Sequence, residues 1–197
     1  MIRDAIVMAA GLGTRLRPLT ERWAKPVLPI DGRPVIASLL RDLAASGVER
    51  ATVVVGHLGH QVEAVVRDGF PLDVRIARQP SPDGSADAVR CGFTVAPTLV
   101  VAADTLFAPV AIAAFSRTFA ASDAGGALAT EGPLWALRQP VADRLCLDAK
   151  PYELLNAFRR AEDEGITILT AEVGPTRDLT SAVDMGERNF PYLEAMQ

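Results

Sequence analysis

Basic residues gather near the start of the chain, directly after two glycines. The glycines are Gly11 and Gly13, and the charged residues between positions 15 and 33 are Arg15, Arg17, Arg22, Lys25 and Arg33 against Glu21 and Asp31. A glycine lets backbone N–H groups approach a phosphate closely, and a guanidinium group adds charge-assisted hydrogen bonds to phosphate oxygens. The pattern therefore indicates a polyphosphate cradle, and an exposed turn with incidental charges is the alternative.

Two common phosphate-binding motifs do not fit this loop. A dinucleotide fingerprint requires a third glycine where this chain has Leu16, and Pro18 would interrupt the helix that should follow. A P-loop requires Gly-Lys-Ser or Gly-Lys-Thr after its variable residues, and this loop contains neither. The cradle is therefore of another kind.

A longer string around the glycines resembles the signature of the sugar-1-phosphate nucleotidylyltransferases, also called NDP-sugar pyrophosphorylases. It consists of AAGLGTRLRPLT at 9–20, KPVLPI at 25–30 and GRP at 32–34. The resemblance implies transfer of a nucleotidyl group from a nucleoside triphosphate to a sugar 1-phosphate, with release of pyrophosphate. It also implies nucleotide contacts at Ala10, Gly11, Gly13, Thr14 and Arg15, and catalytic roles for Arg15 and Lys25.

A second segment, QPSPDGSADA at 79–88, resembles the base-recognition segment of the same family, most closely that of its thymidylyl- and uridylyltransferases. The amide of Gln79 carries both donor and acceptor groups, so it can pair with the edge of a base. Gly84 would let the backbone come close to that base. The resemblance thus implies dTTP or UTP as the preferred nucleotide. A turn at 82–84 is the local structure that these residue types favour, and it is compatible with this role.

Two aspartates are the expected ligands of Mg²⁺, the cofactor that the resemblance implies. Asp104 follows the buried run 100–103, and an acid at the carboxyl end of a central strand needs a cation or hydrogen bonds. Asp178 begins a late segment, 178–184, that resembles the part of the family holding the second magnesium ligand. The alternative is that Asp178 or Thr180 caps the N-terminus of a helix.

The acceptor side departs from the family. Where the family inserts a segment with Glu-Lys-Pro that contacts the sugar, this chain has only Glu131-Gly132-Pro133, and Glu-Lys-Pro occurs nowhere. We therefore expect a complete nucleotide-binding half at 1–105 and a truncated acceptor-binding half at 106–197. Two alternatives stay open: a nucleotide-binding regulatory or scaffolding protein, and an enzyme with another acceptor, such as phosphocholine or an unusual sugar phosphate.

Apolar segments of strand length alternate with amphipathic segments of helix length. We expect strands at 5–9, 51–55, 74–76, 98–102, 126–129, 134–137 and 166–173, and helices at 34–46, 59–66, 85–93, 109–120, 151–162 and 181–194. Strands that are apolar on both faces and separated by helices predict a mainly parallel sheet covered on both sides. The expected fold is one α/β domain, Rossmann-like and three-layered, with ligands beyond the carboxyl ends of its strands.

The composition excludes several other classes of protein. The chain has 197 residues, 49% of them hydrophobic, with 20 Lys plus Arg, 24 Asp plus Glu and a formal charge of −4. This balance argues against nucleic-acid binding, and no apolar run reaches the roughly 18 residues of a membrane span. Cys91 and Cys146 form no disulfide framework, and the N-terminus lacks the features of a signal peptide, so we expect a cytoplasmic protein.

Overall fold

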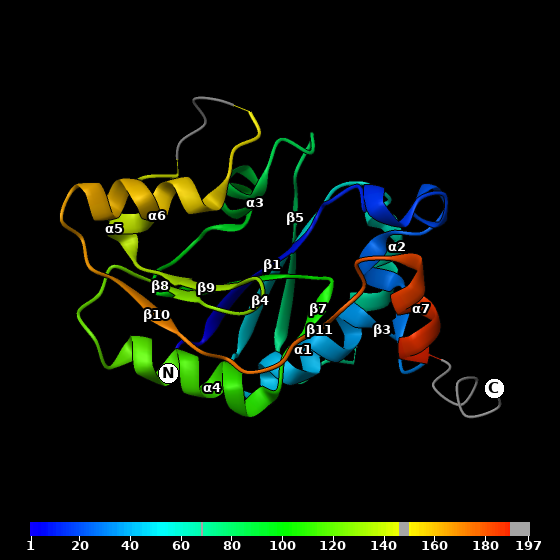
Figure 1. The fold of residues 1–197 in the computed structure, drawn as a ribbon, viewed down its shortest axis with the longest axis horizontal. Coiled ribbons are helices and arrows are strands. Elements are labelled where there is room, and N and C mark those ends of the chain that lie inside the picture. Colours follow the sequence, from blue (N-terminus) through cyan, green and yellow to red (C-terminus); the bar gives the residue numbers. More distant parts are fainter. Residues whose placement is uncertain (68, 146–149, 190–197) are drawn as a thin grey trace.

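A seven-stranded sheet runs through the centre of the molecule (Figure 1). The computed structural model describes residues 1–67, 69–145 and 150–189. In order across the sheet, the strands are β10 (Ile168–Ala171), β8 (Gly126–Ala129), β9 (Leu134–Leu137), β6 (Thr98–Ala102), β1 (Asp4–Ala9), β4 (Arg50–Val55) and β5 (Asp73–Arg78). Neighbouring strands are parallel except at β9, which runs antiparallel to both β6 and β8. The predicted mainly parallel α/β sheet is confirmed.

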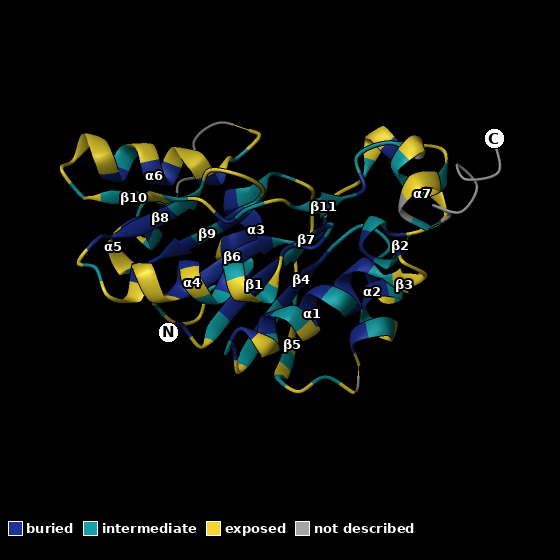
Figure 2. Cartoon of the chain, turned by 60° about the horizontal axis from the view of Figure 1, so that its bottom comes forward, coloured by how far each residue is buried: buried dark blue, intermediate teal, exposed yellow. Residues whose placement is uncertain are grey.

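Helices cover both faces of this sheet. One face carries α1 (Val35–Ala45), α2 (Gly59–Val66) and α4 (Pro109–Ala120), and the other carries α3 (Ser85–Gly92), α5 (Gln139–Ala142) and α6 (Leu154–Asp163). Figure 2 shows α1 and α4 lying across the strands, with buried residues toward the sheet and exposed residues outward. This is the three-layer arrangement that the sequence predicts.

The strand residues alternate between two apolar cores. Val7 and Val53 are fully buried in the core that includes α1, α2 and α4, whereas Ile6 and Val54 belong to the core that includes α3, α5 and α6. The parallel register places Val7 directly beside Val53. Because both faces are buried, these strands are apolar at consecutive positions, which is the pattern that identified them.

Several short elements have no periodic signal in the sequence. The loop after β1 contains three 3-10 turns, at Thr14–Leu16, Leu19–Glu21 and Lys25–Val27, followed by the hairpin of β2 (Pro29–Ile30) and β3 (Arg33–Pro34). Further along the chain, β7 (Thr105–Leu106) pairs antiparallel with β11 (Arg177–Asp178). A separate small core holds this region together through Leu16, Leu28, Ile30, Val35 and Leu179.

Two helices differ from their predicted bounds by more than one residue at an end, whereas α1 and α3 agree with theirs to within one residue. The helix predicted from Pro151 begins at Leu154 instead, because the residues before it bond to the loop that precedes α3 and do not form a helical turn. The last helix, α7, spans Ala182–Asn189, and positions 190–194 of the prediction lie outside the described residues. Within the described part of the chain, no helix combines the length and the apolar character that crossing a membrane requires.

The topology brings three loops to one edge of the sheet. β1, β4, β5 and β6 are parallel, so their carboxyl ends share that edge. The loops that leave it begin at Ala10 after β1, at Gln79 after β5 and at Ala103 after β6. Three of the four segments singled out in the sequence, those at 9–34, at 79–88 and at Asp104, therefore meet at the position where α/β sheets bind their ligands.

Candidate functional site

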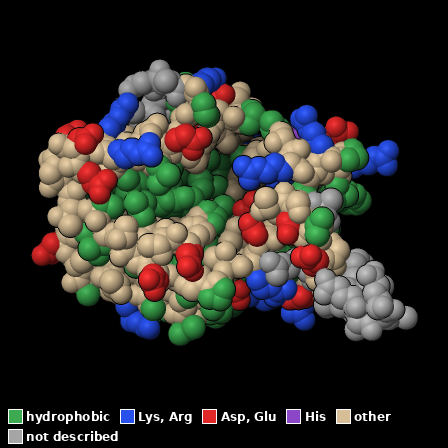
Figure 3. Space-filling view, viewed as in Figure 1, with side chains coloured by type: hydrophobic (Ala, Val, Ile, Leu, Met, Phe, Trp, Pro, Cys, Tyr) green, Lys and Arg blue, Asp and Glu red, His purple; other side chains and the backbone are tan. Residues whose placement is uncertain are grey.

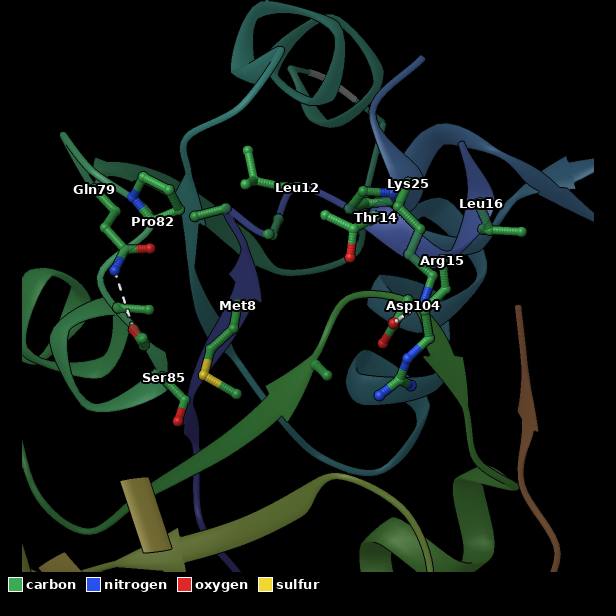
Figure 4. Close-up of a pocket in the computed structure, with 18 residues that line it drawn as sticks. Met8, Leu12, Thr14, Arg15, Leu16, Lys25, Gln79, Pro82, Ser85 and Asp104 are labelled. Atoms are coloured by element: carbon green, nitrogen blue, oxygen red, sulfur yellow. Dashed lines mark hydrogen bonds and ion pairs between the residues drawn. The ribbon is translucent and has the colours of Figure 1, made fainter. Parts of the chain in front are cut away.

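A cavity of about 510 Å³ opens at this edge of the sheet (Figure 4). Every predicted site residue except Asp178 lines it: Ala10, Gly11, Gly13, Thr14, Arg15, Lys25, Gln79, Gly84 and Asp104. The lining also contains residues that were not predicted as site residues. Leu12, Pro82, Ser85 and Ala88 lie within the two motif segments, and Met8 and Ala102 lie on strands β1 and β6. Some of these had a usable signal, since Ser85 and Ala88 lie one helical turn apart directly after Gly84.

The loop after β1 holds Arg15 at the cavity by burying the next side chain. Leu16 is 3% exposed and packs in the small core beside Leu28, whereas Arg15 is exposed and lines the cavity. The Thr20 hydroxyl donates to the Gly13 carbonyl at 2.8 Å, and the Leu16 N–H donates to the same carbonyl at 2.9 Å. The guanidinium therefore projects from an anchored turn.

Helix α2 holds the same loop from the other side. The amide of Gln61 accepts from the Ala24 N–H at 2.8 Å and donates to the Arg22 carbonyl at 2.8 Å. His57 Nε2 lies 3.0 Å from the Thr20 carbonyl oxygen. These contacts join residues 37 to 39 positions apart, so the loop is held by tertiary contacts that its own sequence does not reveal.

Lys25 and Asp104 form an ion pair at the end of the cavity where the sequence predicts the phosphates, called the phosphate end below. Lys25 Nζ contacts Asp104 Oδ2, and the two side chains are 18% and 29% exposed. The Thr105 hydroxyl donates to the other carboxylate oxygen of Asp104 at 3.3 Å. Figure 4 shows Arg15 beside this pair. One carboxylate and two cationic groups thus face the same part of the cavity, which suits a polyphosphate that carries a divalent cation.

Asp178 lies next to this group without lining the cavity. In the β7–β11 pair it is directly opposite Thr105, the residue after Asp104. Its Oδ2 accepts from the Thr180 hydroxyl at 2.8 Å. The alternative of a helix cap at Asp178 or Thr180 does not hold, because Asp184 Oδ2 accepts from the backbone N–H and the hydroxyl of Ser181 in a capping arrangement at the start of α7.

The end of the cavity where the sequence predicts the base, called the base end below, centres on Gln79, which is 6% exposed. Its Nε2 donates to the Gly84 carbonyl at 3.0 Å and to Asp87 Oδ2 at 3.0 Å. In Figure 4 the amide oxygen points into the cavity instead. The sequence predicts an amide that offers a base both a donor and an acceptor; the structure corrects this, because both N–H donors are engaged within the protein and only the oxygen is offered.

An extended segment from the second half of the chain supports the base-end loop. The Tyr152 N–H donates to the Asp83 carbonyl and the Ala86 N–H donates to the Tyr152 carbonyl, both at 2.7 Å. Lys150 Nζ donates to Asp83 Oδ1 at 2.7 Å, and this hydrogen bond raises the pKa of Lys150. The Leu154 N–H donates to the Ser85 hydroxyl at 2.8 Å. Residues 150–154 therefore complete a loop that lies far from them in the sequence.

Gly84 sits where this segment leaves no room for a side chain. Its φ of 126° and ψ of 174° lie in a region that is essentially restricted to glycine. A Cβ there would be 2.5 Å from the backbone N and O of Tyr152. We expect Gly84→Ala to lower the free energy of unfolding by about 1 to 3 kcal/mol from its backbone conformation alone, and the contact with Tyr152 adds to this.

Urea unfolding measures this effect, with Gly11→Ala as the matched control. Gly11 has a negative φ and a Cβ there would meet nothing within 4 Å, so its free energy of unfolding should change by at most about 0.5 kcal/mol. Equal unfolding midpoints for the two variants would show that the segment at Tyr152 moves aside freely, contrary to this prediction.

Beyond the base end, the sheet continues as an apolar surface. Met8 and Ala102 are paired in register, as are Leu128 and Trp135, and all four are partly buried. Figure 3 shows hydrophobic side chains gathered in a hollow between α6 and strands β8 and β9.

The short turn at 131–133, which stands where the sequence lacks Glu-Lys-Pro, is packed against its surroundings: a Cβ on Gly132 would be 2.9 Å from Phe107.

Comparison with known proteins gives one consistent family. The family described as "Nucleotidyl transferase" matches residues 4–136. A 2-aminoethylphosphonate cytidylyltransferase of Lancefieldella rimae is 50% identical over 58 residues, which cover 29% of this chain and 24% of that protein. A glucose-1-phosphate thymidylyltransferase of Streptomyces antibioticus is 38% identical over 92 residues, which cover 46% of this chain and 26% of that protein. The matched part of the chain thus corresponds to about a quarter of either relative's length.

A solved structure shares the fold over the whole chain. A UDP-glucose pyrophosphorylase from Acinetobacter baumannii superimposes with a TM-score of 0.82 at 16% identity, covering 100% of this chain and 99% of that one. At this identity the likeness establishes the three-layer fold and no more than that.

Proposed function

Because the chain belongs to the nucleotidyl transferase family, we propose that it transfers a nucleotidyl group from a nucleoside triphosphate to a phosphorylated small molecule, in the first place a sugar 1-phosphate. The observation that carries this proposal is a single cavity with Arg15, Lys25 and Asp104 at one end and Gln79 with Gly84 at the other. Cationic groups and a carboxylate suit the triphosphate, and a buried amide beside backbone groups suits the base.

The acceptor phosphate needs no general base. The second pKa of a phosphate monoester is about 6, so its oxygen is already anionic at neutral pH. An acceptor oxygen attacks the α-phosphorus, and the bond to the pyrophosphate leaving group breaks. The work left to the protein is to align two anions that repel each other and to neutralise charge at the reacting phosphorus. Arg15 contacts the triphosphate and the leaving pyrophosphate, and Lys25 contacts the α-phosphate or the acceptor phosphate.

Asp104 in the cavity and Asp178 beside it fit Mg²⁺. Asp104 supplies carboxylate oxygens inside the cavity and Asp178 lies across the β7–β11 pair from its neighbour. Mg²⁺ is usually held by one or two carboxylates together with substrate phosphates. Asp104 would hold it, with Asp178 as the second ligand, and bound Mg²⁺ would neutralise charge on the phosphates. For Asp104 to bind the cation, its ion pair with Lys25 has to break, and Lys25 would then contact a phosphate instead.

A pyrophosphate-release assay tests the proposal. It combines the purified protein with Mg²⁺, each of the four nucleoside triphosphates and a panel of sugar 1-phosphates, and a matched series contains excess EDTA. We expect release that depends on both the acceptor and Mg²⁺. Tight nucleotide binding without release for any acceptor would favour the regulatory or scaffolding alternative.

A second acceptor class has its own support. The relative that is 50% identical over 58 residues is named for cytidylyl transfer to 2-aminoethylphosphonate, and the chain lacks the Glu-Lys-Pro segment. The acceptor panel therefore includes 2-aminoethylphosphonate and phosphocholine, each with CTP. Turnover with these and none with sugar 1-phosphates would place the protein in this second class.

The base preference has its own prediction. With dTTP or UTP bound, the N3–H of the pyrimidine donates to Gln79 Oε1, the free acceptor at the base end. Gln79→Ala should therefore raise KM for the preferred nucleotide. The lost buried hydrogen bond costs about 1 to 3 kcal/mol of binding free energy, and the preference among the four nucleotides should shrink by the same amount. Steady-state kinetics with each nucleotide in competition measures this.

Gln139→Ala is the matched control for this substitution. It removes the same side chain from an exposed position, where Gln139 bonds only Asp143 among the described residues. It should leave the nucleotide ranking unchanged. A preference for purine nucleotides in the wild-type protein, or an unchanged ranking in Gln79→Ala, would show that Gln79 serves only the turn.

A further inference from the structure

The buried carboxylate of Asp87 lies behind the amide that faces the base. Asp87 is the third residue of α3 and is 7% exposed. Its Oδ2 accepts from Gln79 Nε2 at 3.0 Å, in a buried hydrogen bond between residues 8 positions apart. Its Oδ1 accepts from Arg90 at 3.2 Å, on the outer side of the helix. One carboxylate therefore joins the base-end amide to an exposed cation.

The partners of Gln79 permit only one orientation of its amide. The Gly84 carbonyl and the Asp87 carboxylate are both acceptors, so the NH₂ group must face them. A rotation by half a turn would place the amide oxygen against two acceptors and lose both hydrogen bonds. Hydrogen bonds to ionised groups are the stronger kind, and burial strengthens them further. Asp87 thus contributes more to this orientation than the neutral carbonyl does.

We propose that Asp87 is a positioning residue for nucleotide selection: it holds the Gln79 amide so that only its oxygen is offered to the base. The inference rests on the proposed function, in which the base lies at this end of the cavity. A base must then present an N–H donor at that point, as the N3–H of uracil and thymine does. Asp87 itself does not line the cavity, so its effect reaches the nucleotide through Gln79.

Direct binding of nucleotides tests this inference without an acceptor. Isothermal titration of UTP, dTTP, CTP, ATP and GTP with Mg²⁺ is compared for wild type, Asp87→Ala, Asp87→Asn and Arg90→Ala. We expect Asp87→Ala to bind the preferred nucleotide about tenfold more weakly, the change for one lost hydrogen bond to a charged group. The other nucleotides should change less, because the released amide can turn its donor toward them.

The conservative variants separate positioning from support of the fold. Asp87→Asn keeps an oxygen that can accept from Gln79, so it should retain most of the selectivity. Arg90→Ala removes the other partner of Asp87. The Arg90 side chain is 57% exposed, so this variant should retain the wild-type ranking of nucleotide affinities. In a Gln79→Ala background, Asp87→Ala should cause no further loss of selectivity, because the amide through which it acts is absent.

Each contrary outcome has a distinct meaning. A selective wild-type protein whose ranking is unchanged in Asp87→Ala overturns the inference and leaves the proposed function standing. The inference also fails if Asp87→Ala weakens all five nucleotides equally while Tm falls, or if its effect persists undiminished in the Gln79→Ala background. A wild-type protein that binds all five nucleotides equally contradicts the base assignment in the proposed function as well.

Discussion

Arg15→Ala should lower kcat by about 10² to 10³, the scale for the loss of one preorganised electrostatic donor. The guanidinium lies at the phosphate end of the cavity, where charge develops on the reacting phosphate and on the leaving pyrophosphate. The side chain is exposed, and the loop is anchored by Leu16 and Thr20, so Tm should change little. Steady-state kinetics at saturating Mg²⁺, together with thermal unfolding, measures both quantities.

Arg17→Ala is the matched control for this prediction. Arg17 is also an exposed arginine, two positions away, and it does not line the cavity. A general loss of positive charge near the site affects both variants, whereas contact with the substrate affects only Arg15→Ala. Near-normal turnover in Arg15→Ala would remove Arg15 from the mechanism.

Asp104→Asn should lower Mg²⁺ affinity and activity together, because it keeps the shape of the side chain and removes the charge that holds the cation. Activity measured against Mg²⁺ concentration should need a higher concentration for half-saturation and reach a lower maximum. Asp31→Asn is the control, since Asp31 pairs with Arg177 away from the cavity. It should leave the Mg²⁺ dependence unchanged.

The ion pair with Lys25 gives Asp104 a second possible role, and the same titration separates the two. If the carboxylate serves only to neutralise Lys25, Asp104→Asn lowers Tm and leaves the Mg²⁺ dependence as in wild type. Removing one partner of a partly buried pair leaves the other charge uncompensated, which is the reason for the lower Tm. That pattern would contradict the assignment of Asp104 to Mg²⁺.

The regular elements could be predicted from the sequence because their signals are local. The bounds of β6, α2 and α4 agree residue for residue with the prediction, since each is a continuous apolar or periodic segment that ends at a polar residue or a turn. The cavity lining followed from the same logic: the motifs come after strands, and the carboxyl ends of parallel strands share one edge.

The rest depends on contacts between distant segments, for which no local pattern exists. The start of α6 could not be predicted because residues 150–153 bond to the loop at 83–86. The Gln79 amide donates to Asp87 because α3 packs beside the end of β5, and Lys25 meets Asp104 across 79 positions of sequence. A resemblance in sequence predicts which residues form a site, but the tertiary fold determines their hydrogen-bond partners.

The support of the base-end loop by residues 150–154 also sets an order of events during synthesis. Lys150 bonds to Asp83 and Leu154 to Ser85 across 67 and 69 positions. While the ribosome has added only the strands up to β6, the phosphate loop can already settle against α2. The base loop can bond to Val55 and Asp87 early, but its hydrogen bonds with Lys150, Tyr152 and Leu154 form only after these residues have left the ribosome. A nascent chain should therefore order the phosphate loop before the base loop is complete.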